Sequence, residues 1–202
     1  MIRTFYASLT FNRSIPTNCR RERYPKRMHT TFIALGGNLP SWAGEPEATL
    51  AAAVQRLESL GQITSRSSLY STEPVGLADQ PRFVNAVVEL QTGLEPLALL
   101  HRLLDLETEF GRDRSAGIAN GPRTLDLDLL LYQEKILDEP ELQLPHPRLA
   151  ERAFVLVPWA EIAPQVRDPR SGKTAAELLQ ALLDKFPDDA LAVQQFRCEV
   201  WG

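Results

Sequence analysis

The segment 123–131, with the sequence RTLDLDLLL, constrains the fold more than any other part of the chain. Leucines alternate with polar residues along it, and side chains on a strand point to alternate faces. We therefore expect a strand whose alternating leucines, Leu125, Leu127, Leu129 and Leu131, pack against helices. Thr124, Asp126 and Asp128 are expected side by side on the opposite face. Such a strand requires a sheet with helices packed on it.

Apolar patterning along the rest of the chain predicts the other elements of this sheet. Strands are expected over 31–35, 62–71, 83–91 and 124–132, and helices over 46–60 and from Pro96 to about Phe110. Gly36-Gly37-Asn38 is expected to stop the first strand in a turn. Further helices are expected at about 147–153 and 174–185, and a short strand at 192–198. The order strand–helix–strand–strand–helix–strand is that of a ferredoxin-like α+β sandwich, an antiparallel sheet with helices packed on it.

The length of 202 residues fits one domain, which we expect over residues 28–202. Residues 1–27 show no apolar periodicity and are expected to be a disordered extension. Three explanations of this segment stay open. It is a targeting peptide, or a basic tail, or Met28 is the true start of the protein.

The distribution of charge limits the partners of the chain. Residues 1–27 hold seven basic residues and one acidic residue, so the rest carries 15 basic and 25 acidic residues, a net charge of −10. An acidic body is a poor partner for nucleic acid. No apolar run is long enough to span a membrane, and two distant cysteines, Cys19 and Cys198, suit a reducing compartment. We therefore expect a soluble, cytoplasmic protein that binds neither nucleic acid nor membrane.

Asp126 and Asp128 are the first candidates for a chemical role. Two carboxylates about 7 Å apart on a strand repel each other, unless a cation lies between them. Oxygen ligands favour Mg²⁺, which takes one or two carboxylates and completes its shell with substrate phosphates. The alternative is an ordinary strand with two acids on its solvent-facing side.

Arginines next to this pair favour the first interpretation. Gly121-Pro122 places Arg123 directly before the strand, and Arg112 and Arg114 end the preceding helix. The guanidinium group suits phosphate. Phosphoryl transfer needs this combination of carboxylates, metal and arginines. Each arginine taken alone could equally be a surface charge.

Phe83 and Asn85 share one face of the strand 83–91. An amide in such an apolar run must be paired, either with backbone or with the edge of a flat heterocycle. Phe83 could stack on that ring or belong to the core. His146, Arg152 and Phe154 follow in a Pro-rich segment, where His146 is either structural or a ligand for ATP.

The chain resembles the 6-hydroxymethyl-7,8-dihydropterin pyrophosphokinase family of folate biosynthesis. The motifs that carry the resemblance run in order from about residue 31 to 164: ALGGNL at 34–39, YSTEPVG at 70–76, DQPRFVNA at 79–86, GRDR at 111–114, GPRTLDLD at 121–128, PHP at 145–147, RAF at 152–154 and EIAP at 161–164.

The resemblance implies a role for each matching residue. Asp126 and Asp128 would bind two Mg²⁺ ions that bridge the phosphates of ATP. Arg112 and Arg123 would be catalytic. ATP would be bound by Glu107, Arg114, Leu129, His146 and Arg152. The pterin would lie between Phe83 and Phe154 and be recognised by Thr72, Pro74, Val75 and Asn85. The hydroxymethyl oxygen would attack the β-phosphorus and AMP would leave. No general base is assigned, and a monomer is expected.

Two departures from the family pattern affect these expectations. Many members have Ser at the position of Gly37, and many have an Arg–Trp pair where this chain has Ala119 and Asn120. That pair belongs to a loop that closes over ATP, so turnover and affinity depend on how this chain does without it. Two other functions stay open: a weakened pterin- or nucleotide-binding module, and a metal-dependent phosphohydrolase that uses the same two acids.

We expect that removing residues 1–27 leaves activity unchanged, because every matching motif lies beyond them. Pterin-dependent AMP release by the full chain and by residues 28–202 tests this. A large loss in the shortened chain would show that the extension folds onto the catalytic domain.

Overall fold

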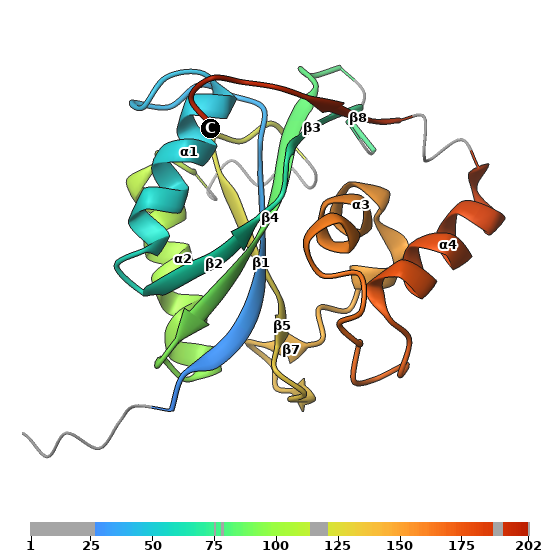
Figure 1. Ribbon diagram of the computed structural model, residues 1–202. Coiled ribbons are helices and arrows are strands. Elements are labelled where there is room, and N and C mark those ends of the chain that lie inside the picture. The colour runs from blue at the N-terminus through green and yellow to red at the C-terminus, as the bar shows by residue number, and fades with distance from the viewer. Residues whose placement is uncertain (1–26, 75, 78, 114–120, 188–191, 202) are drawn as a thin grey trace, which may run out of the picture.

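An antiparallel sheet forms the centre of the computed structural model, which describes residues 27–74, 76–77, 79–113, 121–187 and 192–201 (Figure 1). Its strands are β1 (His29–Gly37), β2 (Gly61–Arg66), β3 (Leu69–Thr72), β4 (Phe83–Thr92), β5 (Asp126–Tyr132) and β8 (Val193–Phe196). They lie in the order β5-β1-β4-β3-β8, and β2 also pairs with β4. Every pairing is antiparallel. The predicted βαββαβ core is therefore confirmed.

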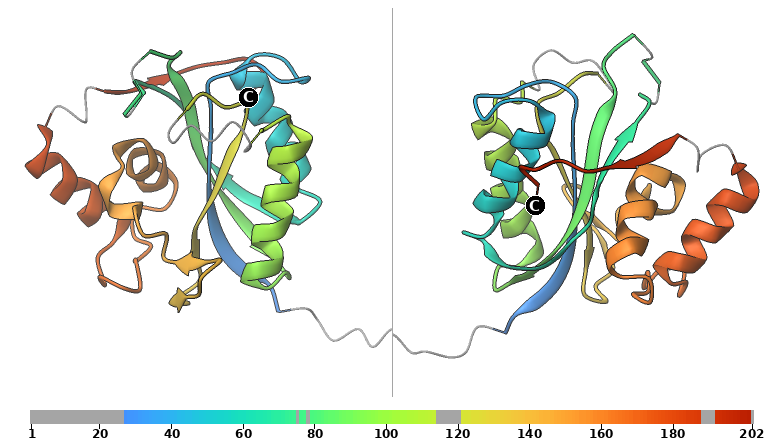
Figure 2. Two further views of the ribbon diagram at one scale, coloured as in Figure 1. Left: turned by 180° about the vertical axis from the view of Figure 1, so that it is seen from behind. Right: turned by 45° about the horizontal axis from the view of Figure 1, so that its top comes forward.

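Helices cover both faces of the sheet. α1 (Pro46–Leu57) and α2 (Pro96–Glu109) lie on one face, and α3 (Ala153–Ile162) and α4 (Ala175–Lys185) lie beyond the other (Figures 1 and 2). α1 and α2 both begin with proline, whose missing N–H is no loss in the first turn. A small hairpin of β6 (Leu137–Asp138) and β7 (Gln143–Leu144) and the short helix η1 (Leu149–Glu151) connect β5 to α3. The result is three layers.

The sheet separates two apolar cores. On the side of α1 and α2, the core includes Leu35, Leu50, Val88, Leu99, Leu103 and Phe110. On the side of α3 and α4, it includes Phe32, Val87, Leu156, Trp159 and Leu182. Strand β4 feeds both cores because its residues alternate: Val84, Ala86, Val88 and Leu90 belong to the first, and Val87 to the second. This alternation confirms the predicted faces of β4.

The leucines of β5 do not all face the same way. Leu125, Leu127 and Leu129 lie in the first core as predicted, but Leu131 lies in the second. The pairing of β1 with β5 shifts between Phe32, opposite Leu131, and Ile33, opposite Leu129, so the strand contains a bulge. An extra residue in one strand reverses the alternation beyond it. The expectation for Leu131 was therefore wrong.

The two glycines at the end of β1 belong to the strand, which corrects the predicted turn. Gly36 pairs with Asn85 and Gly37 with Val84 on β4. A Cβ atom at Gly37 would lie 2.3 Å from the carbonyl oxygen of Thr124, so glycine allows the chain before β5 to approach closely. In this chain the glycine therefore serves packing, and a serine would require Thr124 to shift.

Two other boundaries differ from the predicted ones. The strand expected over 62–71 is two strands, with a bend at Ser67–Ser68 between them. The helix expected near 147–153 is only the short η1, and α3 begins at Ala153 and continues through Pro158. Its apolar residues follow one another without a polar face, so periodicity did not mark this helix. The predicted helix at 174–185 and the strand within 192–198 are confirmed by α4 and β8.

None of the described helices is long and apolar enough to cross a membrane.

Thr174→Ala should lower the free energy of unfolding by about 1 kcal/mol, because Thr174 caps α4. Its hydroxyl accepts from the Glu177 amide at 3.1 Å, and the Glu177 carboxylate accepts from the Thr174 amide at 2.7 Å. Urea denaturation of both forms measures the difference. The control is Thr108→Ala, an exposed threonine inside α2 that caps nothing. Equal effects of the two changes would contradict the capping argument.

Candidate active site

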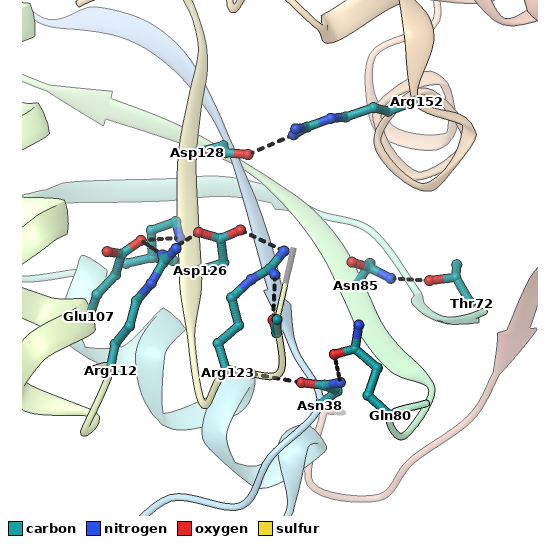
Figure 3. A network of polar contacts seen from close by, with 12 residues as sticks. Asn38, Thr72, Gln80, Asn85, Glu107, Arg112, Arg123, Asp126, Asp128 and Arg152 are labelled. Atoms are coloured by element: carbon teal, nitrogen blue, oxygen red, sulfur yellow. Dashed lines mark hydrogen bonds and ion pairs between the residues drawn. The ribbon is translucent and has the colours of Figure 1, made fainter. Parts of the chain in front are cut away.

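Asp126 and Asp128 lie on the face of β5 opposite its core leucines, with side chains 19% and 30% exposed (Figure 3). Across the sheet they face small residues of β1, Gly36 and Ala34. The absence of bulk on β1 leaves space in front of the two carboxylates. The two carboxylates therefore lie on the same face of β5, as predicted.

Arginines from two segments hold Asp126. Arg112 leaves the end of α2 after Gly111, whose φ of +84° suits glycine, and pairs with Asp126 Oδ1. Arg123 donates from Nη2 to Asp126 Oδ2 at 3.0 Å. A carboxylate that is largely withdrawn from water needs such partners. The two guanidinium groups therefore compensate the charge of Asp126.

Glu107 fixes Arg112 in place. Its side chain is only 1% exposed, and its Oε1 accepts from Arg112 Nη1 at 2.5 Å and from the Leu127 amide at 2.8 Å. The buried carboxylate joins α2 to the backbone of β5 between the two aspartates. Glu107 thus orients an arginine of the site.

Asp128 has different partners. Arg152, at the start of α3, donates to Asp128 Oδ2 at 3.0 Å, and His146 Nε2 lies 4.0 Å from the same oxygen. The Arg148 amide donates to His146 Nδ1 at 3.1 Å, so a neutral ring carries its proton on Nε2. Burial lowers the pKa of His146, Asp128 opposes this shift, and Arg152 and Arg148 lower the pKa further.

A cavity of about 230 Å³ opens beside the acid pair. It is lined by Thr72, Glu73, Phe83, Asn85, Arg123, Arg148, Glu151, Arg152, Ala153, Phe154, Ala192 and Val193. Asn85 is buried and donates to Thr72 Oγ1 at 2.8 Å, which orients its amide (Figure 3). Phe83 on β4 and Phe154 on α3 supply two aromatic walls. The cavity can take a flat ring with polar groups on its edge.

Two arginines connect the cavity with the acid pair. The guanidinium of Arg123 lies 4.7 Å from the centre of the Phe83 ring, and that of Arg152 lies 5.5 Å from the centre of the Phe154 ring. Each therefore contacts an aspartate and an aromatic wall at once. The acid pair and the cavity therefore share these two side chains.

Asn38 is a site residue that the sequence did not single out. Its side chain is buried, at 3% exposure (Figure 3). The amide nitrogen Nδ2 donates to Gln80 Oε1 and to the Pro81 carbonyl, both at 3.0 Å. The amide oxygen Oδ1 accepts from the Arg123 backbone amide at 2.8 Å. It thus joins the loop before β4 to the loop before β5. A polar residue directly after an apolar strand was the signal that could have identified it.

Not every predicted site residue joins the constellation. The Leu129 side chain lies in the core on the other face of β5, so only its backbone could meet a nucleotide. Pro74 is partly buried beyond Thr72 and Glu73, which line the cavity. Val75, Arg114, Ala119 and Asn120 lie outside the described residues.

The donor set fits a hard cation that arrives with phosphates. Within the described ranges no three His, Cys, Asp or Glu side chains cluster, so Asp126 and Asp128 would supply the protein ligands alone. Mg²⁺ accepts such a sparse set when phosphate oxygens and water complete its shell. Arg123 Nε and Thr124 Oγ1 are buried beside the pair without a hydrogen-bond partner in the described structure, so polar atoms of a ligand could satisfy them.

Solved structures support the fold. The crystal structure of Plasmodium falciparum HPPK-DHPS wild type with pteroate aligns with a TM-score of 0.65 at 13% identity, over 83% of this chain and 48% of that one. A second, the A437G form with SDX-DHP, gives a TM-score of 0.67 at 14% identity, over 86% of this chain and 50% of that one. The chain spans about half the length of these neighbours. At such identities the likeness shows the ferredoxin-like fold alone.

Curated relatives are much closer in sequence. The 2-amino-4-hydroxy-6-hydroxymethyldihydropteridine pyrophosphokinase of Pseudomonas aeruginosa is 47% identical over 152 residues, which are 74% of this chain and 90% of that protein. The protein of the same name from Bacillus subtilis is 42% identical over 149 residues, 72% of this chain and 86% of the relative. The sequence model of 7,8-dihydro-6-hydroxymethylpterin-pyrophosphokinase (HPPK) matches residues 32–164, which include every motif described above. The chain therefore belongs to the 7,8-dihydro-6-hydroxymethylpterin-pyrophosphokinase family.

Proposed function

We propose that this chain transfers pyrophosphate from ATP to the hydroxymethyl group of 6-hydroxymethyl-7,8-dihydropterin and releases AMP, a step of folate biosynthesis. Membership of the HPPK family supports the reaction. The observation that carries the proposal is the geometry of Arg123 and Arg152, which connect an acid pair with a cavity suited to a flat ring.

The cavity beside β4 is the proposed pterin site. Phe83 and Phe154 would hold the ring between them, and the buried Asn85, oriented by Thr72, would bind its polar edge. Such an amide selects strongly between ligands, because a ring without matching polar groups would leave the buried Asn85 amide without a hydrogen-bond partner. Val75 and Pro74 are proposed to contribute from the adjoining loop.

The nucleotide would lie along β5. Arg112, Arg123 and Arg152 already converge on the acid pair, and the triphosphate would draw on the same guanidinium groups. His146 would donate from Nε2 to a phosphate oxygen. Glu107 would act by holding Arg112, while Arg114 and the backbone of Leu129 complete the proposed set.

Asp126 and Asp128 are proposed to hold two Mg²⁺ ions, which would neutralise phosphate charge and orient the triphosphate when bound. The oxygen of the pterin hydroxymethyl group then forms a bond to the β-phosphorus, and its proton passes to water. The bond from the β-phosphorus to the bridging oxygen of AMP breaks, and AMP leaves with the electron pair. The arginines bind the equatorial and leaving oxygens as charge moves onto them. No side chain is assigned as general base.

The two rival functions have less support. A weakened binding module would follow from the absence of the Arg–Trp pair at Ala119 and Asn120, which lie outside the described residues. A phosphohydrolase would not need a cavity with two aromatic walls and an oriented amide. The cytoplasmic location and the monomeric state expected from the sequence stay predictions.

The direct test is AMP release from ATP and Mg²⁺, with and without the pterin. Pterin-dependent AMP with an equal amount of pterin pyrophosphate supports the proposal. Pterin binding without AMP would favour the binding module, and phosphate release without pterin would favour the hydrolase.

Asp126→Ala should reduce pterin-dependent AMP release by at least about 100-fold, the range seen when a group that stabilises transition-state charge is removed. The change removes a proposed metal ligand and leaves Arg112 and Arg123 without their shared partner. The control is Asp105→Ala, an exposed carboxylate on α2 that pairs only with Arg102 at 3.6 Å in the described structure. Near-normal turnover in Asp126→Ala would contradict the metal assignment.

Asn85→Ala should raise the KM for the pterin by roughly 10-fold to 100-fold and leave the KM for ATP little changed, because one buried polar partner is lost. Gln91→Ala serves as the control, since Gln91 is an amide on the same strand that bonds Thr30 far from the cavity. Steady-state kinetics with each substrate varied in turn gives both constants. Equal increases in the two KM values would contradict the assignment of Asn85 to the pterin site.

A further inference from the structure

Three distant segments meet at the bend Ser67–Ser68 between β2 and β3. Glu161, near the end of α3, accepts hydrogen bonds from Ser68. Gln195 on β8 donates to Ser68 Oγ at 2.7 Å, and Trp201 donates from its indole to the Ser67 carbonyl at 2.8 Å. None of these residues lines the cavity or contacts the acid pair in the described structure.

The Glu161 carboxylate is the strongest acceptor at this bend. Oε1 accepts from Ser68 Oγ at 2.8 Å, and Oε2 accepts from the Ser68 amide at 2.9 Å and from the Tyr70 hydroxyl at 3.0 Å. Burial raises the pKa of Tyr70 to about 12, and Glu161 contributes to the rise, so the hydroxyl stays protonated and donates at neutral pH. Bonds to an ionised acceptor are stronger than neutral ones. Glu161, itself exposed, therefore joins α3 to Ser68 and β3.

Tyr70 belongs to the same patch of sheet as the proposed pterin site. On β3 it shares a face with Thr72, two residues on, and across the sheet it lies opposite Asn85, while Thr72 lies opposite Phe83. Residues directly opposite each other in an antiparallel pair are close neighbours. The Tyr70 hydroxyl thus connects the part of the sheet that carries Thr72 and Asn85 to α3.

The second aromatic wall of the cavity, Phe154, belongs to α3. Phe154 lies at the start of this helix and Glu161 lies seven residues later, about 10 Å along the helix at the usual rise, with Pro158 between them. Loss of the contacts between Glu161 and Ser68 or Tyr70 would change the tilt of α3 relative to β3. Phe154 would then shift relative to Phe83. The gap between the two rings depends on that tilt.

Strand β8 borders the same cavity from the side. Val193 at its start lines the cavity, and the strand pairs with β3 from Leu69 to Thr72, as Figure 2 shows for the red C-terminal segment. Trp201 anchors the end of this segment: it is 6% exposed, and the Arg66 guanidinium lies 4.7 Å from its ring centre. β8 lies outside residues 32–164, which match the family, yet it forms part of the site.

We propose that Glu161 is a positioning residue that sets the width of the pterin slot between Phe83 and Phe154, through its bonds to Ser68 and Tyr70. This inference rests on the proposed function. Contacts at Ser67–Ser68 connect three parts of the cavity lining: the strands β3 and β4, the helix α3 with Phe154, and the strand β8 with Val193. Glu161 does not line the cavity, so it acts through the position of α3.

The experiment compares Glu161→Gln and Tyr70→Phe with the wild-type chain. Glu161→Gln removes the negative charge and one acceptor at nearly constant volume, and Tyr70→Phe removes only the hydroxyl donor. The control is Glu58→Gln, an exposed carboxyl beyond the end of α1 and distant from the bend. For each form we would measure kcat, both KM values, the Tm and the pterin Kd by calorimetry with a non-hydrolysable ATP analogue present.

Glu161→Gln should raise the KM and the Kd for the pterin by roughly 10-fold, since a small displacement of Phe154 has a large effect on binding. The KM for ATP should stay within about two-fold of the wild-type value. Tyr70→Phe should act in the same direction but less strongly. The effects of the two changes should not add in the double variant, because both break one interaction. The control should match the wild type.

Two outcomes would overturn the inference. An unchanged pterin Kd in Glu161→Gln would show that the slot does not depend on this carboxylate. A lower Tm with equal changes in both KM values would show that Glu161 serves stability alone. If the wild type bound pterin without releasing AMP, the proposed function would fail, and the Kd comparison would still decide the role of Glu161.

Discussion

Two carboxylates on adjacent outward positions of β5, about 7 Å apart by strand geometry, are the constraint on which the rest of the site depends. Their mutual repulsion and partial burial require positive charge nearby. The chain supplies it from three directions, with Arg112 from α2, Arg123 from the loop before β5 and Arg152 from α3. Ion pairs thereby connect the helices on both faces of the sheet to one strand.

The three-layer arrangement places the charged cluster of β5 beside the cavity of β4. The sheet buries an apolar core on the side of α1 and α2, which leaves the opposite side of β4 and β5 available where α3 does not cover it. Charged residues gather over β5 and aromatic ones over β4. Arg123 and Arg152 belong to both groups, because each guanidinium pairs with a carboxylate at its edge and lies near an aromatic ring.

Three features of the fold differ from the predicted ones for identifiable physical reasons. Helix α3 was missed because it is buried on most sides and has no polar face, so its residues show no helical period. Gly36 and Gly37 suggested a turn, but glycine also permits close approach of backbones, and here Thr124 occupies that space. The reversed direction of Leu131 arose from a bulge, which depends on the partner strand and leaves no local pattern.

The order of elements, the antiparallel core and the placement of Asp126 and Asp128 on one face could be predicted from the sequence, because they follow from periods of two and of about 3.6 residues within short segments. Asn85 could also be recognised as a buried polar group that needs a partner. Which residues become partners depends on the tertiary structure. Asn38 joins two loops, and Glu161 reaches a bend more than 90 residues away in the chain. Such contacts depend on how whole elements pack, and no local pattern records the distance between residues that lie far apart in sequence.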